Sequence, residues 1–307
     1  MSVNTPAGNT PPSSEHHHGF DIDKRRSRWP LIISSAAVIA VVAGFAGYRV
    51  LGDDASPNEV QGATLEVVTA EGNASEQRLV EFVAEEIAPD YNIEIAFRGL
   101  EDSNTLNRAV HTGEVAGTIY QHELWLGQVL DANPDFELEA ATPVFRWGFG
   151  IYSSQHDSIE ELPDGANVSL YSDPANEAQG LWLLESAGLI ELDDSINKWE
   201  ATQDDIVANP KDLEFTLLDF AAQARALDDL DATVGYIEYY SSAGVSEDLL
   251  IHNPLAPDEF AGQLTISSRW KDEPNIQNLV AAFQDERVQD FLRDDAEIGN
   301  NLRPLEE

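Results

Sequence analysis

The stretch GEVAGTIYQHELWL, residues 113–126, contains a strand pattern, a polar aromatic triplet and the start of a helix in direct succession. Residues 115–119 are small or β-branched, which is typical of a buried strand. Residues 123–130 then carry leucine and valine at helical spacing. Tyr120 and His122 stand at the strand's end, where ligands bind in open α/β sheets. The two residues are therefore candidate ligand contacts, although a satisfied pair in the core would give the same pattern.

Strand and helix patterns alternate on both sides of this stretch. Such alternation predicts an α/β architecture with a mostly parallel sheet. Short apolar runs with β-branched residues predict strands at 64–69, 93–97, 144–153, 168–171, 214–218, 232–239 and 262–268. Apolar residues at helical spacing predict helices at 75–87, 105–111, 177–187, 220–227 and 275–293.

The composition excludes several classes of protein. The formal net charge of the 307-residue chain is −39, so it should repel nucleic acid and anionic lipid. The chain has no cysteine, and we therefore expect no disulfide, no thiolate metal site and no lipid-modified cysteine. It also lacks the G-x-S-x-G, P-loop, G-x-G-x-x-G and H-E-x-x-H motifs. We expect no enzymatic activity, no metal and no cofactor.

The N-terminal part has the pattern of a membrane anchor. Residues 1–30 are mostly polar and predict a disordered cytoplasmic tail that ends in the basic run 24–28. Residues 31–51 are almost wholly apolar and long enough to cross a bilayer. The positive-inside rule then predicts a single-pass membrane protein with its N-terminus in the cytoplasm, a linker at 52–62 and an extracellular binding domain. A cleaved signal peptide is the alternative.

Several motifs resemble a known family. Residues 205–213 read DIVANPKDL, residues 172–176 read SDPAN and residues 181–190 read LWLLESAGLI, and these follow Gln121-His122 in the family's order. The resemblance is to the methionine-binding lipoproteins of ABC importers, the NlpA/MetQ-like substrate-binding proteins, and it extends over residues 63–307.

The resemblance implies a type II periplasmic-binding-protein fold. Two α/β lobes, residues 63–152 plus 240–307 and residues 153–239, would be joined by two crossovers. The protein would capture methionine or a related amino acid, small peptide or amine in the interlobe cleft and deliver it to a membrane permease. The alternative is an extracellular sensing module that signals through a partner receptor.

The resemblance also implies ligand contacts. Tyr120 and His122 would pack on the ligand side chain, and Trp147 would supply a further aromatic surface. Ser172 and Asn176 match the two ends of the family's N-D-P-T-N loop.

Three positions depart from the family pattern. Gln179 stands where the family has an arginine that is expected to bind the ligand carboxylate, and Tyr236 and Glu238 replace two asparagines. Arg146 should not replace that arginine, since adjacent strand residues such as Arg146 and Trp147 point to opposite faces. We therefore hypothesise a ligand that has an amine and an altered or absent carboxylate contact. The alternative is that methionine still binds through other groups.

Overall fold

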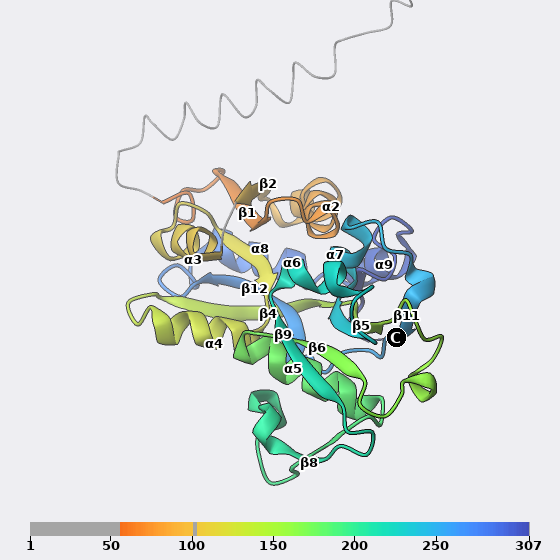
Figure 1. The fold of residues 1–307 in the computed structure, drawn as a ribbon. Helices are drawn as coiled ribbons and strands as arrows, with labels where there is room; N and C mark the ends of the chain where they lie inside the picture. The colour runs from red at the N-terminus through yellow and green to blue at the C-terminus, as the bar shows by residue number, and fades with distance from the viewer. Residues whose placement is uncertain (1–55, 101–102, 307) are drawn as a thin grey trace, which may run out of the picture. The chain divides into compact units, whose positions relative to one another are not determined.

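A computed structural model describes residues 56–100 and 103–306 (Figure 1). Its larger sheet has the strand order β13-β4-β12-β3-β1-β2. The strands are β1 (Thr64–Ala70), β2 (Glu94–Leu100), β3 (Gly117–Gln121), β4 (Leu138–Trp147), β12 (Ala261–Ser267) and β13 (Leu302–Arg303). β1 is parallel to β2 and β3, whereas β12 is antiparallel to β3 and β4, and β13 is antiparallel to β4. Helices accompanying this sheet are α2 (Ala74–Phe82), α3 (Ser103–Thr112), α4 (Glu123–Ala132), α8 (Pro274–Phe283) and α9 (Glu286–Asp294).

A second set of strands forms the other half of the fold. β5 (Phe149–Tyr152) lies between β10 (Thr233–Tyr236) and β11 (Leu250–His252), and β6 (Asn167–Tyr171) pairs in parallel with β9 (Glu214–Leu218). A single bridge from Val168 of β6 to Ala232, next to β10, joins these two small sheets into the second group of strands. The other elements of this half are α5 (Pro174–Ser186), α6 (Phe220–Gln223), α7 (Ile237–Ser242) and the short pair β7 (Glu191–Leu192) and β8 (Ile206–Ala208).

The chain passes between the two groups of strands twice. The first passage is Gly148, between β4 and β5, and the second is 253–260, between β11 and β12. Gly148 is required at its position because a Cβ there would lie 1.9 Å from the carbonyl oxygen of Asn300. Since β5 pairs with both β10 and β11, we propose that the second lobe runs from about 149 to 252, a wider range than the predicted 153–239.

Four local predictions need correction. The larger sheet is mixed, not mostly parallel. The strand predicted at 144–153 is split at Gly148 into parts of two sheets, and the strand predicted at 232–239 ends at Tyr236, where α7 begins. The helix predicted at 275–293 is two helices, because Asp285 caps a new one and accepts a hydrogen bond from the Arg287 backbone N–H. Each break depends on tertiary pairing or on a cap that the apolar pattern does not show.

The N-terminal predictions fall mostly outside the described residues. Residues 1–30 and 31–51 lie there entirely. Of the predicted linker, residues 56–62 are described, and they form turns that contact the rest of the fold. The Ser56 hydroxyl donates to the carbonyl oxygen of Gly113 at 2.8 Å, and the Asn275 amide donates to the carbonyl oxygen of Val60 at 2.9 Å.

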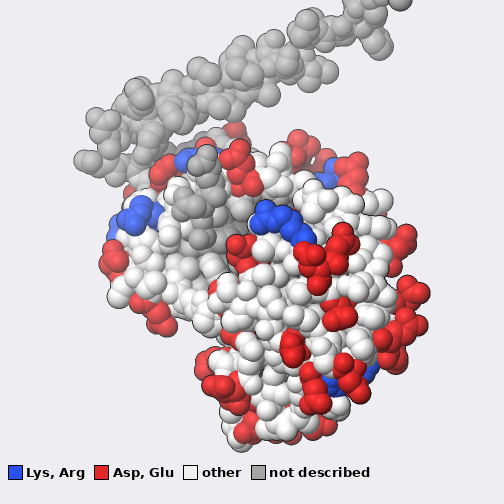
Figure 2. Space-filling model, viewed as in Figure 1, with Lys and Arg blue, Asp and Glu red and all other residues white. Residues whose placement is uncertain are grey.

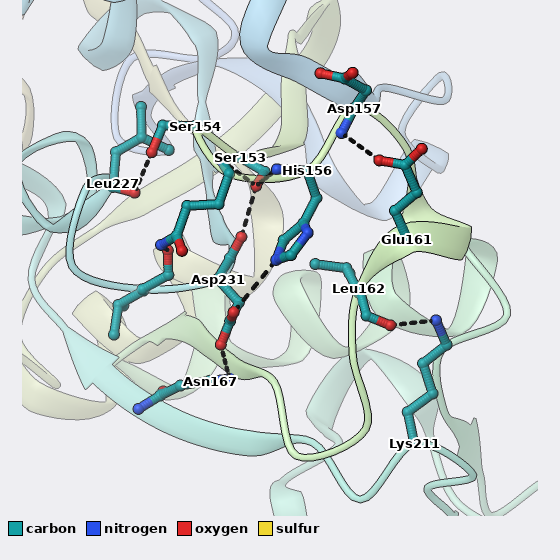
Figure 3. A network of polar contacts seen from close by, with 12 residues as sticks. Ser153, Ser154, His156, Asp157, Glu161, Leu162, Asn167, Lys211, Leu227 and Asp231 are labelled. Carbon is teal, nitrogen blue, oxygen red and sulfur yellow. Dashed lines mark hydrogen bonds and ion pairs between the residues drawn. The ribbon is translucent and has the colours of Figure 1, made fainter.

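The family-like motif at 205–213 has a structural role. The Lys211 ammonium donates to the carbonyl oxygens of Glu160 at 2.9 Å and Leu162 at 2.6 Å, and the second contact is part of the network drawn in Figure 3. In that network the Asp231 carboxylate accepts from the backbone N–H of Asn167 at 2.8 Å and lies 3.3 Å from His156 Nε2. These contacts connect Lys211 and Asp231 to neighbouring segments of the second group of strands.

Candidate functional site

A cavity of about 360 Å³ opens where strands and helix N-termini from both groups converge. The carboxyl ends of β1 and β3 lead into it, as the rule for α/β sheets predicts. Its volume lies in the range of small-molecule sites. Six of the fourteen lining residues are Phe, Tyr or Trp, and two are acids. The whole lining is Ala70, Asn73, Glu76, Leu106, Tyr120, Gln121, His122, Trp125, Trp147, Asn176, Phe220, Tyr236, Glu238 and Tyr239.

Most of the predicted ligand contacts come together here, although their role in binding stays a prediction. The predicted residues that line the cavity are Tyr120, His122, Trp147, Asn176, Tyr236 and Glu238. Ser172 and Gln179 are not in the lining. Ser172 is exposed, and its backbone N–H donates to Leu218. Gln179 is fully buried, and its Oε1 accepts from the Tyr236 hydroxyl at 2.8 Å.

Glu76 is the most unusual residue of the cavity. It is the third residue of α2, and the N-cap Asn73 side chain accepts its backbone N–H at 3.0 Å. The residue is 2% exposed, the Trp147 indole donates to Oε1 at 3.0 Å, and Oε2 has no hydrogen-bond partner among the described residues. Burial raises the pKa of Glu76 to about 8, the Trp147 hydrogen bond opposes this, and the charge of Glu238 adds to it. Glu76 is therefore largely protonated at neutral pH in the empty cavity.

His122 is a neutral group in the cavity wall. It caps α4, and its Nδ1 accepts the backbone N–H of Trp125 at 3.2 Å, so the neutral ring carries its proton on Nε2. Burial lowers the pKa of His122 to about 4, while the neighbouring Asn176 amide opposes this. His122 can thus offer a ligand a neutral donor and a flat face, but no positive charge at neutral pH.

Tyr236 organises the second side of the cavity. Its hydroxyl oxygen also lies within hydrogen-bond distance of Oδ1 of Asn176, whose amide nitrogen donates to Asp173 at 2.8 Å. Burial raises the pKa of Tyr236 well above its usual value, so the hydroxyl stays protonated. The ring packs edge to face against Trp147, with 5.8 Å between ring centroids. The tyrosine thus occupies the space between Gln179 and the cavity.

Glu238 connects the two halves of the fold at the cavity's edge. Its carboxylate accepts a hydrogen bond from the Ser75 hydroxyl of α2, and the Asn301 amide donates to that hydroxyl at 3.0 Å. The two acids of the lining thus come from different elements, Glu76 from α2 and Glu238 from α7, which the Ser75 hydrogen bond joins.

The arginine next to Trp147 does not contact the cavity. Arg146 is buried and donates to the carbonyl oxygens of Leu305, at 2.9 Å, and Ala256, and it pairs with Asp258. The expectation that it points away from Trp147 is therefore confirmed. None of the described residues that line the cavity is Lys or Arg.

Sequence reasoning missed several lining residues, including Asn73, Glu76, Trp125, Phe220 and Tyr239. One signal was available for the first two. The spacing N-x-x-E directly after a predicted strand marks a helix N-terminus, and the loops that follow strands face the ligand in this architecture. Trp125, Phe220 and Tyr239 carry no such signal, because aromatic residues on helices usually pack in the core.

The chain is similar to several known proteins. It is 27% identical over 257 residues to the methionine-binding lipoprotein MetQ of Bacillus subtilis, covering 82% of this chain and 93% of that protein. It is 29% identical over 239 residues to the probable D-methionine-binding lipoprotein MetQ of Haemophilus influenzae, covering 77% and 86%. A solved structure described as an ABC transporter periplasmic substrate-binding protein from Coxiella burnetii superposes with a TM-score of 0.68 at 28% identity, covering 78% and 99%.

These relatives correct the predicted localisation. A single-pass protein with a cytoplasmic N-terminus is contradicted because the curated relatives are lipoproteins, which a lipid holds at the membrane. Among the residues that the structure describes, no helix is both long and apolar enough to span a bilayer. The apolar segment 31–51 lies outside those residues.

The family itself follows from a match over most of the chain. Residues 67–303 match the family described as NlpA lipoprotein, and this range includes both groups of strands and the whole lining of the cavity. The fold is accordingly the α/β fold of periplasmic binding proteins, as the resemblance implied. The chain belongs to the NlpA lipoprotein family.

Proposed function

We propose that this protein is the solute-binding component of an ABC importer. It captures methionine or a related amino acid, small peptide or amine in the cavity and delivers it to a membrane permease. The observation that carries the proposal is the cavity of about 360 Å³, which lies between the two groups of strands and is lined with aromatic rings. Family membership and the relatives' methionine-binding names support it. No bond is made or broken in this function, which depends on closure of two lobes over the solute.

The test is a binding screen on the purified chain, unfolded and refolded to remove any bound solute. The panel contains the D- and L-amino acids, methionine dipeptides and aliphatic amines. A solute that binds only the folded state raises the melting temperature by mass action, and calorimetry then gives its dissociation constant. If no member of the panel raises the melting temperature or produces heat of binding, the proposed function is wrong.

A pair of matched variants connects binding to this cavity. Tyr239→Ser removes an aromatic side chain that lines the cavity but is 43% exposed, so the core is little disturbed. Leu217→Ser removes a side chain of similar exposure, 47%, that does not line it. The first variant should weaken binding about tenfold, as expected for one aromatic contact, and the second should leave it unchanged.

A further inference from the structure

We propose that the cavity is specific for an organic cation, a solute with an ammonium group and an apolar body but no carboxylate. Glu76 and the surrounding aromatic rings bind this solute. This inference rests on the proposed function, because it names the solute class of the same cavity.

The first observation is a buried carboxyl oxygen without a hydrogen-bond partner in the described part of the chain. Oε1 of Glu76 is satisfied by the Trp147 indole, whereas the buried Oε2 has no partner among the described residues. A buried carboxyl oxygen is stabilised by a hydrogen bond or an opposite charge, and an ammonium group supplies both. The second acid of the lining, Glu238, is close enough to act on Glu76 electrostatically and accepts a hydrogen bond from the adjacent Ser75.

The second observation is the aromatic surface around these acids. Trp147, Phe220, Tyr236 and Tyr239 lie together, with ring centroids 5.8 Å apart for Trp147–Tyr236, 6.1 Å for Phe220–Tyr236 and 5.7 Å for Phe220–Tyr239. Aromatic faces attract cations through their quadrupole, most strongly where water is excluded. Such a surface also takes up the apolar part of the solute.

The third observation is the lack of a positive group for a solute carboxylate. Gln179 lies behind Tyr236 and does not line the cavity, and it carries no charge. Arg146 is committed to Asp258 and two carbonyl oxygens, and Arg78 of α2 to Asp295 and Glu297. A glutamine amide does not replace a bidentate guanidinium–carboxylate pair. A zwitterion would therefore bring its carboxylate close to two acids with no cation to balance it.

The protein surface is negatively charged, which is the sign that the acids lining the cavity carry when they are ionised. Figure 2 shows Asp and Glu side chains spread over the visible face, with few Lys or Arg between them. The formal charge of −39 makes association with cations faster and with anions slower, most of all at low ionic strength.

Binding should couple to the titration of Glu76. The ionisable groups near it are Glu238 on α7, Tyr236 and Tyr239, and His122, which also lines the cavity. Both tyrosines have raised pKa values, and His122 is neutral above about pH 4. A bound cation stabilises the ionised form of Glu76, so binding of the cation releases the proton of the Glu76 carboxyl group when the pH lies below about 8.

The experiment uses three probes that share a methylthioalkyl body. These are 3-(methylthio)propylamine with only the ammonium, 4-(methylthio)butanoate with only the carboxylate, and methionine with both. Calorimetry on the refolded chain at pH 6 and pH 8 should show the amine binding at least tenfold more tightly than methionine, and the acid not binding. With the pKa of Glu76 at about 8, amine affinity should rise about 50-fold from pH 6 to pH 8. Titrations at pH 7 in buffers of different ionisation heat should show about one proton released.

Two variants identify the group responsible. Glu76→Gln should lose the amine's advantage, the pH dependence and the proton release together, whereas Glu85→Gln, an exposed acid that follows α2, should retain all three. Circular dichroism confirms that each variant is folded. Tighter binding of methionine than of the amine, or affinity that does not change with pH, overturns the inference and leaves the proposed function standing. If neither these probes nor the wider panel binds, both fail.

Discussion

Replacing Glu76 by glutamine should change the way in which the stability of this protein depends on pH. The carboxyl group is buried, and its pKa is raised from 4.5 to about 8 in the folded protein. Between these values the folded state holds a proton that the unfolded state has lost, so the free energy of unfolding falls as pH rises. The contribution is present in full below pH 4.5 and is lost by about pH 8.

The slope is about 1.4 kcal/mol per pH unit. From pH 5 to pH 8 the wild-type protein should therefore lose about 3 to 4 kcal/mol through this one group. Glutamine has nearly the same shape, keeps an oxygen for the Trp147 indole and does not ionise. The difference in free energy of unfolding, Glu76→Gln minus wild type, should rise by that amount over the same range.

The assay is urea unfolding of the solute-free chain at pH 5, 6, 7 and 8, followed by circular dichroism. The many surface acids contribute equally to wild type and variant and cancel in the difference. Glu85→Gln, at an exposed position, is the control, and its difference from wild type should stay near zero at every pH. A difference for Glu76→Gln that is the same at pH 5 and pH 8 would refute the assignment of a raised pKa to this residue.

Three further substitutions test the cavity and the first passage between the strand groups. Trp147→Phe removes the indole hydrogen bond to Oε1 of the buried Glu76, so we expect a loss of about 1 to 3 kcal/mol in urea unfolding, and an unchanged midpoint would contradict it. As pH falls from 6.5 to 4, the free energy of unfolding of the wild type should drop by about 3 kcal/mol, because only the unfolded state protonates His122 there, and His122→Gln should not show this drop. Parallel curves of unfolding free energy against pH for the two proteins would contradict a lowered pKa of His122. Gly148→Ala should lower the melting temperature by several degrees, because its Cβ would clash with the carbonyl oxygen of Asn300. Gly127→Ala, in open space on α4, should raise the melting temperature slightly. Equal effects of the two substitutions would contradict the predicted clash at Gly148.

Local patterns were sufficient for much of the fold. β1, β3 and α3 are found within two or three residues of their predicted positions, because each has its own apolar periodicity. The triplet around Tyr120 and His122 lies at the end of a strand and beside a cavity, as its position in an α/β pattern predicted. Order and spacing of short motifs were sufficient for the family, since they depend on neighbouring residues alone.

The features that concern specificity were decided by tertiary structure. The resemblance predicts an arginine where this chain has Gln179, but only packing places Gln179 behind Tyr236 and commits Arg146 elsewhere. Glu76 looks like an ordinary helix-capping acid in the sequence, and it becomes a buried, proton-holding group because Trp147, 71 residues away, covers it. Burial and pKa depend on groups that are distant in the chain, and for this reason periodicity and spacing determine where strands and helices form but not how a cavity is charged.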